Sequence, residues 1–286
     1  MTEQLNPRVV ERILQRLGLT EKPSADLAGL TQIYDAWCRK VPFDNIRKLI
    51  HVRSADPGTL PGDTPSDFFE SWLSNGSGST CWGGNGALCA LLEALEFDAC
   101  RGVATMMVAP DLPPNHGTVI VRVDNYLYGV DASILHGQPL SLDREGPTSV
   151  NHPAWGVKAS FRDDRWHTFW RPLHKPEGIE CRIEYFPSTP QEFHDRYEQS
   201  RAWSPFNYEL HIRINRGDSV IGVALGQKVE FSPDGSVMKT DLDHIGRQEF
   251  LIRECGMSEE LIDRLPVDTP TPPPPGSKTA RTAPLG

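Results

Sequence analysis

The 286-residue sequence contains no apolar run that approaches the roughly 20 residues of a membrane-spanning helix. Its opening stretch, MTEQLNPRVVERIL, is polar with helical spacing, unlike the apolar centre of a secretory signal. Blocks of lysine and arginine are also missing, and 38 acidic residues outnumber 29 basic ones. We therefore expect a cytoplasmic protein with neither a nucleic acid nor a membrane as its partner.

The six cysteines form neither a Cys-x-x-Cys pair nor a closely spaced framework. Such spacing favours free thiols in a reducing compartment over disulfides or a zinc site, so we expect no metal centre. One of these thiols is then free to carry chemistry of its own.

Hydrophobic periodicity divides the chain into three folded parts and a tail. Residues 1–98 carry apolar residues at helical spacing, whereas 99–187 form short β-type runs broken by Pro, Gly, Asn and Asp, typical of an antiparallel barrel or sandwich. Residues 188–266 predict a helix, strands and further helices, which together make a small α/β unit. The stretch 267–286 is rich in proline with little to bury, which predicts a disordered or polyproline tail. The expected fold class is α+β.

The segment GSTCWGGNGALCALLEAL, residues 78–95, begins as a glycine-rich loop and becomes an apolar helical pattern at Cys81. A thiol at a helix start lies near unpaired N–H groups and the positive end of the helix dipole, which favours the thiolate. The neighbouring glycines allow close approach of a substrate, and a backbone N–H here is a candidate oxyanion donor. Since most free cysteines are small buried hydrophobic residues, this segment alone does not establish catalysis.

A second candidate element is NHGTVIVRVDNYLYGVDAS, two β-type runs that meet at Asp124-Asn125. A two-residue loop there predicts a β-hairpin in which His116 lies on the same face as Asp131, one diagonal step away. A carboxylate–imidazole pair fixes the histidine tautomer and stabilises the imidazolium ion, which beside Cys81 would hold the thiolate. A surface hairpin with a solvent-facing histidine and aspartate is the alternative.

The order and spacing of these residues resemble the arylamine N-acetyltransferase family. In that family Asn follows the nucleophilic cysteine by four residues and Gly often follows by five, as Asn85 and Gly86 follow Cys81; its histidine and aspartate lie 15 residues apart, as here. The stretch VPFDNI at 41–46 resembles its Val-Pro-Phe-Glu-Asn motif. The segments SPFNYELHIRI and GVALGQKVEFSPDGS are similar to the start of its C-terminal domain. The resemblance covers about residues 5–265.

This resemblance implies a helical domain with the nucleophile, an antiparallel β-barrel with the histidine and aspartate, and an α/β lid, around a core like that of cysteine proteases and transglutaminases. It also implies ping-pong transfer of an acyl group from acyl-coenzyme A, usually acetyl-coenzyme A, to an arylamine, hydrazine or hydroxylamine. Coenzyme A would be a co-substrate, with no cofactor bound. The catalytic residues would be Cys81, His116 and Asp131. Candidate substrate-binding residues are Phe43, Trp82 and Gly117, although aromatic residues in positions such as those of Phe43 and Trp82 more often belong to the core.

The sequence departs from the family directly before the nucleophile. The family has Arg-Gly-Gly-aromatic there, whereas residues 77–80 read SGST, and Gly83 replaces a common Glu or Gln. Asp44 corresponds to a glutamate that can pair with the missing arginine, so its partner is not evident. Residues 132–135, ASIL, replace a common Val-Gly-Phe-Gly. These changes preserve thiol chemistry and leave the specificity for the amine open.

Three other functions stay open. Amide synthases related to the family release a polyketide-type chain from an acyl carrier protein as an amide or macrolactam, and a rebuilt pocket suits a large acyl chain. A cysteine hydrolase would use the same three residues but admit water to the acyl-enzyme. A binding module with an inactive triad is the non-enzymatic alternative.

Overall fold

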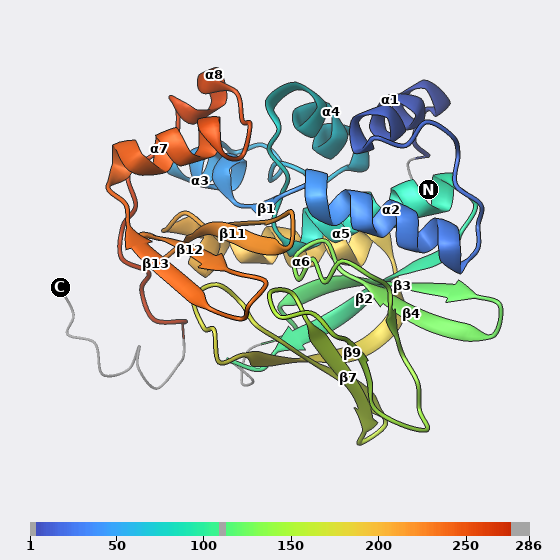
Figure 1. Cartoon of the computed structure of the whole chain (residues 1–286). Helices are drawn as coiled ribbons and strands as arrows, with labels where there is room; N and C mark the ends of the chain where they lie inside the picture. Colours follow the sequence, from blue (N-terminus) through green and yellow to red (C-terminus); the bar gives the residue numbers. More distant parts are fainter. Residues whose placement is uncertain (1–3, 109–112, 276–286) are drawn as a thin grey trace.

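The computed structural model describes residues 4–108 and 113–275 and shows helices above a strongly curved sheet (Figure 1). The N-terminal helices are α1 (Pro7–Leu17), α2 (Leu27–Lys40), α3 (Ile46–Arg53), α4 (Pro65–Asn75) and α5 (Cys81–Ala94). After the barrel come α6 (Pro190–Ala202), a short 3-10 turn (Pro205–Asn207), α7 (His244–Arg253) and α8 (Glu259–Ile262). Polar side chains cap most of these helices; Asp26, for example, accepts a hydrogen bond from the N–H of Gly29.

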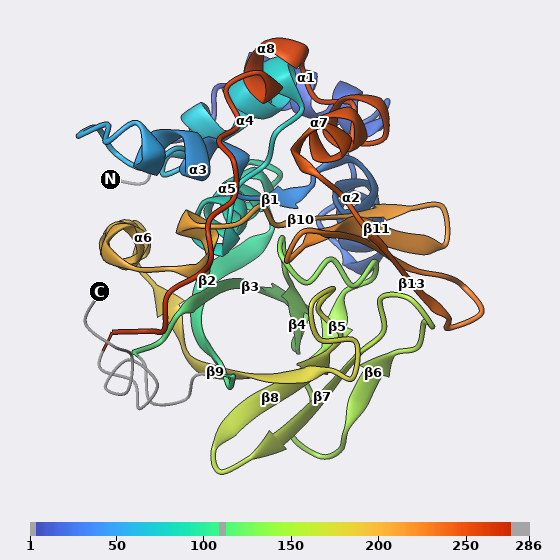
Figure 2. The same cartoon turned by 90° about the vertical axis from the view of Figure 1, so that its left-hand side faces the viewer.

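The larger sheet is antiparallel, with strands in the order β5-β4-β3-β2-β9-β8-β7-β6. Its strands are β2 (Asp98–Met106), β3 (His116–Val123), β4 (Tyr126–Val130), β5 (Leu140–Ser141), β6 (Thr148–Val150), β7 (Val157–Arg162), β8 (Arg165–Trp170) and β9 (Ile179–Ser188). The two edge strands approach each other, since the Thr148 hydroxyl donates to the Ser141 carbonyl. The result is a nearly closed barrel (Figure 2).

The predicted hairpin is confirmed. Val123 pairs with Tyr126 across the loop, and Asp124 has the positive φ of 54° that such a loop requires. The ladder continues to Val119 and Val130, so His116 and Asp131 lie just beyond its end, at the rim of the barrel closest to α5.

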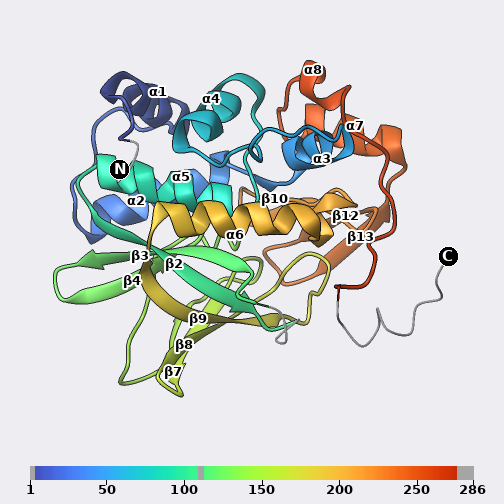
Figure 3. The same ribbon diagram turned by 180° about the vertical axis from the view of Figure 1, so that it is seen from behind.

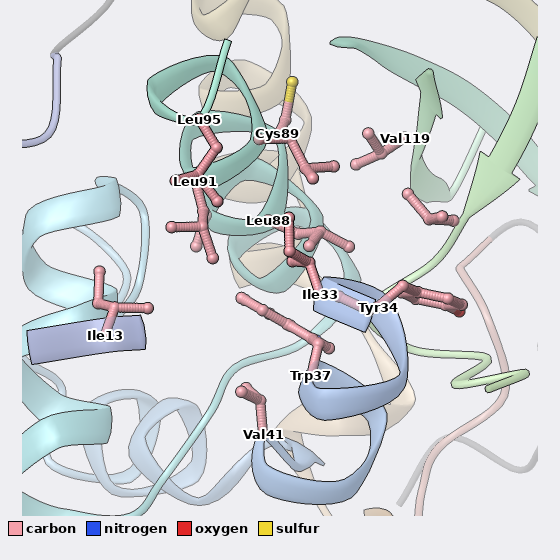
Figure 4. Packing of buried hydrophobic residues seen from close by; sticks show 14 of the residues in the cluster. Ile13, Ile33, Tyr34, Trp37, Val41, Leu88, Cys89, Leu91, Leu95 and Val119 are labelled. Carbon is pink, nitrogen blue, oxygen red and sulfur yellow. The ribbon is translucent and has the colours of Figure 1, made fainter. Parts of the chain in front are cut away.

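The central helix α5 is apolar around almost its whole circumference and is correspondingly buried. Figure 4 shows Ile33 and Trp37 of α2 directed toward Leu88 and Leu91 of α5, with Val119 of β3 beyond. Seen from behind, α6 lies along α5 (Figure 3). Because α5 is held between α2, α4, α6 and the barrel, its first residue has a fixed position.

The C-terminal sheet has the antiparallel order β1-β10-β11-β12-β13, formed by β1 (Phe43–Asp44), β10 (Ile212–Arg216), β11 (Ser219–Ala224), β12 (Gln227–Phe231) and β13 (Val237–Asp241). Since β1 comes from the helical region, residues 1–98 contribute a strand to the C-terminal unit. With that addition, the fold class is the predicted one: α+β, with N-terminal helices, an antiparallel barrel and a C-terminal α/β unit.

The segment 267–275, where the sequence predicts the start of a disordered or polyproline tail, contacts the rest of the described chain. Asp268 accepts a hydrogen bond from the N–H of Leu210 and pairs with Arg247 at 2.6 Å, and the Trp203 indole donates to the carbonyl of Pro272. Figure 2 shows the chain after α8 running down the molecule toward the barrel. The amino-acid composition of this segment does not predict these contacts, because they use backbone carbonyls and a few polar side chains. Residues 276–286 of the predicted tail lie outside the described residues.

Within the described ranges, every helix is too short or too polar to cross a lipid bilayer.

Candidate active site

Cys81 is the first residue of α5, as the sequence predicted, and its side chain is buried. The first hydrogen bond of the helix joins the N–H of Gly84 to the carbonyl of Thr80 at 2.8 Å. The N–H groups of Cys81, Trp82 and Gly83 therefore have no partner within the helix. These three N–H groups lie at the positive end of the helix dipole, where a helix can bind an anion.

His116, at the start of β3, lies next to the Cys81 thiol and is buried with Asp131. Its Nε2 is 2.8 Å from Asp131 Oδ2, and the two side chains are 3% and 4% exposed. Burial alone would lower the pKa of His116, but the charge of Asp131 and hydrogen bonds with Asp131 and Cys81 raise that pKa well above its usual value. The Cys81 thiol also donates to the carbonyl of Asn115, at 3.9 Å. The structure thus brings Cys81, His116 and Asp131 together.

The carboxylate of Asp131 has a fixed orientation. Its Oδ1 accepts from the N–H groups of Ser133 at 2.8 Å and Ile134 at 3.0 Å, which leaves Oδ2 for His116. Burial raises the pKa of Asp131, yet the positive charge of His116 and these hydrogen bonds lower it to about 2. The carboxylate therefore stays ionised throughout the neutral range.

Two buried side chains that sequence reasoning did not place in the site hold this arrangement. Asn85 donates to the carbonyl of Gly117 at 2.6 Å and accepts from the N–H of Ala132 at 2.9 Å, so it joins α5 to both sides of the hairpin. The Tyr34 hydroxyl accepts from the N–H of Asp131 and donates to its carbonyl. The spacing of four residues between Cys81 and Asn85 could have indicated that Asn85 belongs to the site. Tyr34, in contrast, has the sequence pattern of an ordinary core residue of an amphipathic helix.

Asp44 binds the loop before Cys81, in place of the arginine partner that the family has. Its carboxylate, only 1% exposed, accepts from the N–H of Gly78 at 2.6 Å and from the Ser77 hydroxyl at 3.0 Å. Burial raises the pKa of Asp44 to about 6, although these hydrogen bonds oppose the rise. Gly83 is equally constrained, because a Cβ there would lie 2.7 Å from the carbonyl oxygen of Gly62. The loop is thus close-packed without the family's usual residues.

A cavity of about 460 Å³ opens beside Cys81 and His116. Two of the predicted substrate-binding residues, Phe43 and Trp82, line it, together with Met106 and residues of α6 and the C-terminal sheet. Gly117 lies elsewhere: a Cβ on it would be 2.8 Å from the Trp82 ring and 3.0 Å from Phe193. Its position supports Trp82 and does not form part of the cavity wall.

Lys48 of α3 is a further residue of the cavity that sequence reasoning missed. Its side chain is 3% exposed, and Nζ donates to the Ser200 hydroxyl at 2.7 Å. Burial lowers the pKa of Lys48 to about 7, while the charge of Cys81 favours the ammonium form. The site therefore has a second titratable base near the thiol, besides His116.

Three parts define the class of the fold. An α-helix starts on a thiol, a nearly closed antiparallel barrel carries the histidine and aspartate, and an α/β unit follows the barrel. No protein-family model matches the sequence. A curated arylamine N-acetyltransferase of Mycolicibacterium smegmatis is 33% identical over 102 residues, 35% of this chain and 35% of that protein, so the match spans about a third of the relative's length.

Solved structures of arylamine N-acetyltransferases are similar over almost the whole chain. The enzyme of Mycobacterium abscessus matches with a TM-score of 0.73 and 16% identity over 89% of this chain and 94% of its own. The enzyme of Salmonella typhimurium gives 0.73 and 15% over 91% and 98%. That of Mycobacterium marinum in complex with CoA gives 0.75 and 15% over 89% and 97%. The fold is therefore that of the arylamine N-acetyltransferases, and the resemblance indicated by the sequence motifs is confirmed.

Proposed function

We propose that this protein is a ping-pong N-acyltransferase that moves an acyl group from acyl-coenzyme A, through an acyl-enzyme on Cys81, to an amine. The observation that carries the proposal is the buried His116–Asp131 pair beside a thiol at the start of α5. The similar proteins are named as arylamine N-acetyltransferases, and one of them was solved with CoA, which supports acetyl-coenzyme A and an arylamine as substrates.

In the first half-reaction the Cys81 thiolate attacks the thioester carbonyl, and the N–H groups at the start of α5 stabilise the tetrahedral oxyanion. The C–S bond to coenzyme A then breaks, and the His116 imidazolium protonates the departing thiolate. In the second half-reaction the amine attacks the acyl-enzyme, neutral His116 takes the amine proton, and Cys81 leaves as the thiolate. Asp131 keeps the proton of His116 on Nε2, so that Nδ1 faces the thiol in both steps.

Intact mass spectrometry of the full chain tests this function. Incubation with acetyl-coenzyme A is expected to add one acetyl group, and an added aromatic amine is expected to remove it as the N-acetyl product. Cys81→Ser should form no adduct, whereas Cys255→Ser, a matched change at a partly buried thiol outside the site, should behave like the unmodified protein. Equal acylation of Cys81→Ser would overturn the proposal.

An amide synthase with a carrier-bound polyketide-type acyl chain is the second candidate, favoured by a mostly apolar cavity much larger than an acetyl group. Adducts only from long acyl thioesters or an acyl carrier protein would select it. Rapid loss of the acyl group without an amine would instead indicate a hydrolase, and a Cys81 that alkylates no faster than the other thiols would indicate a binding module. We place the reaction in the cytoplasm.

A further inference from the structure

Lys48 is a buried lysine in the wall of the cavity that also contains Cys81. Only 3% of the residue is exposed, yet no carboxylate among the described residues lies within 4 Å of its Nζ. Lys228, in contrast, pairs with Glu254 at 2.6 Å. A buried ammonium ion without a counter-charge is unfavourable, because it loses its hydration and gains no Coulomb energy in return. The surroundings of Lys48 therefore decide whether it carries a charge.

Neutral groups hold the Lys48 nitrogen in place. Nζ donates to the Ser200 hydroxyl at 2.7 Å and lies 5.5 Å from the centre of the Tyr197 ring. The Ser200 hydroxyl donates its own proton to the carbonyl of Tyr197, so its oxygen accepts from Lys48. An ammonium ion and a neutral amine can both donate this hydrogen bond. Lys48 can therefore gain or lose a proton without leaving its position.

Cys81 is the charged group that acts most strongly on Lys48. Burial lowers the pKa of Lys48 to about 7, and the charge of Cys81 opposes this fall more than any other group does. Arg201 and Glu198 of α6 act in opposite directions, and they pair with each other at 2.8 Å. Other titratable or charged side chains line the cavity or lie on α3, and none of them shifts the pKa of Lys48 comparably: His51, His116, His174, Arg196, His211 and Arg213.

The interaction between the two groups works in both directions. If the Cys81 thiolate favours the Lys48 ammonium ion, the ammonium ion favours the thiolate by the same free energy. Acylation removes the negative charge of Cys81, since a thioester is neutral. Burial then dominates, and a buried ammonium ion that has lost its counter-charge gives up its proton. The charge of Lys48 is therefore linked to the covalent state of Cys81.

We propose that Lys48 is a positioning residue for the charge of Cys81: its ammonium ion stabilises the thiolate of the free protein, and Lys48 releases that proton when Cys81 is acylated. The proposal rests on the proposed acyltransferase function for the acylation step, and it deepens that function by adding a proton that the triad does not carry. While the C–S bond to coenzyme A breaks and His116 protonates the departing thiolate, the proton of Lys48 passes to solvent. When the amine removes the acyl group, Cys81 becomes a thiolate again and Lys48 takes a proton from solvent.

Nuclear magnetic resonance of lysine labelled with ¹³C at Cε reports the protonation of Lys48, because the Cε chemical shift changes when Nζ titrates. The full chain is titrated from about pH 5 to about pH 10, and the signal that is missing from Lys48→Met belongs to Lys48. We expect a midpoint near pH 7 in the unmodified protein and about one pH unit lower in Cys81→Ser, whose hydroxyl is neutral and similar in size. A midpoint in Cys81→Ser that is equal or higher overturns the proposal, as does an ordinary lysine midpoint of about 10.4 in the unmodified protein.

The reactivity of Cys81 tests the other direction of the interaction. Iodoacetamide modifies the thiolate, and its rate at about pH 6 should fall about tenfold in Lys48→Met, because the charge that stabilises the thiolate is gone. Lys48→Arg, which keeps a permanent charge, should retain the rate. Lys228→Met changes a paired lysine outside the cavity and should alkylate like the unmodified protein. Unchanged alkylation of Lys48→Met contradicts the proposal, as does a loss that Lys48→Arg shares.

Urea unfolding separates this role from a structural one. Methionine is apolar and similar in length to lysine, so Lys48→Met should unfold at a urea concentration at least as high as the unmodified protein does. A variant that alkylates slowly because it is destabilised would unfold at a lower concentration, and the slow alkylation would then count against the proposal.

Counting of protons connects Lys48 to the reaction itself. The full chain is mixed with acetyl-coenzyme A near pH 6.5 in weakly buffered solution that contains a pH indicator. With a midpoint that moves from about 7 to about 6, the unmodified protein should release about half a proton more per acylated site than Lys48→Met. Equal release from the two proteins contradicts the proposal. If no thioester acylates Cys81, the proposed function fails, whereas magnetic resonance and alkylation still decide the role of Lys48.

Discussion

Replacement of Asp131 by asparagine separates the charge of this residue from its shape. Oδ1 accepts hydrogen bonds from the N–H groups of Ser133 and Ile134, so an oxygen must remain there. In Asp131→Asn the side-chain NH₂ is then forced into the Oδ2 position, 2.8 Å from Nε2 of His116. Because that NH₂ can only donate, Nε2 must accept and the imidazole proton moves to Nδ1. The nitrogen that faces Cys81 then cannot accept the thiol proton.

The expected loss in the rate of Cys81 acylation is about 10³- to 10⁴-fold, the scale on which a wrong histidine tautomer acts in a catalytic triad.

The free energy of unfolding of the Asp131→Asn protein should change as well. The pKa of Asp131 falls from 3.8 to about 2 in the folded state, which corresponds to roughly 2 kcal/mol of stabilisation. This contribution is fully present above pH about 4 and is lost as the pH falls through 2. The free-energy difference between the two proteins should therefore shrink in acid.

Two assays check this reasoning. Single-turnover mass spectrometry gives the acylation rate at pH 7, and urea unfolding from pH 7 down to pH 3 gives the free energy of unfolding. Asp98→Asn, a change at an exposed carboxylate, serves as the control. Acylation by Asp131→Asn within tenfold of the unmodified rate would refute the proposed role of the carboxylate, even if stability changed as expected.

Three further predictions concern the surroundings of the site. Because the pKa of Asp44 rises to about 6, its stabilising contribution is present below pH 3.8 and lost as the pH rises through 6; Asp44→Asn should remove up to roughly 3 kcal/mol of that pH dependence in urea unfolding, and identical pH profiles would contradict this. Gly117→Ala should cost about 1–3 kcal/mol and slow acylation, because its Cβ would press on Trp82; unchanged chemical denaturation argues against the packing. Asp268→Ala should lower stability by about 2 kcal/mol, measured by thermal unfolding, since it leaves Nη1 of Arg247 and the backbone N–H of Leu210 without their partner; an unaltered melting temperature would show that the segment contributes nothing.

The sequence predicted those features of the fold and site that local patterns encode. The helix that starts at Cys81 follows from a glycine-rich loop before an apolar run, and the hairpin follows from Asp124-Asn125 between alternating strands. Strand β1 was not predicted, because two residues give no periodicity and the pairing partner lies in β10, far along the chain. Tyr34 was missed for a related reason. Its role comes from its hydrogen bonds to the backbone of Asp131, which lies 97 residues away in the sequence, and local patterns do not carry such a contact.

The loop before Cys81 shows how an arginine that the arylamine N-acetyltransferases have at this position can be replaced by different chemistry. An arginine would neutralise the buried carboxylate of Asp44 with a full charge, whereas the Ser77 hydroxyl and the Gly78 N–H offer only dipoles. Dipoles are sufficient to orient the loop, because each carboxylate oxygen still has a donor. They are insufficient to hold the pKa of Asp44 at its ordinary value, since burial is only partly offset. The chain thus keeps the geometry that presents Cys81, and the consequence is a stability that decreases as Asp44 ionises near pH 6.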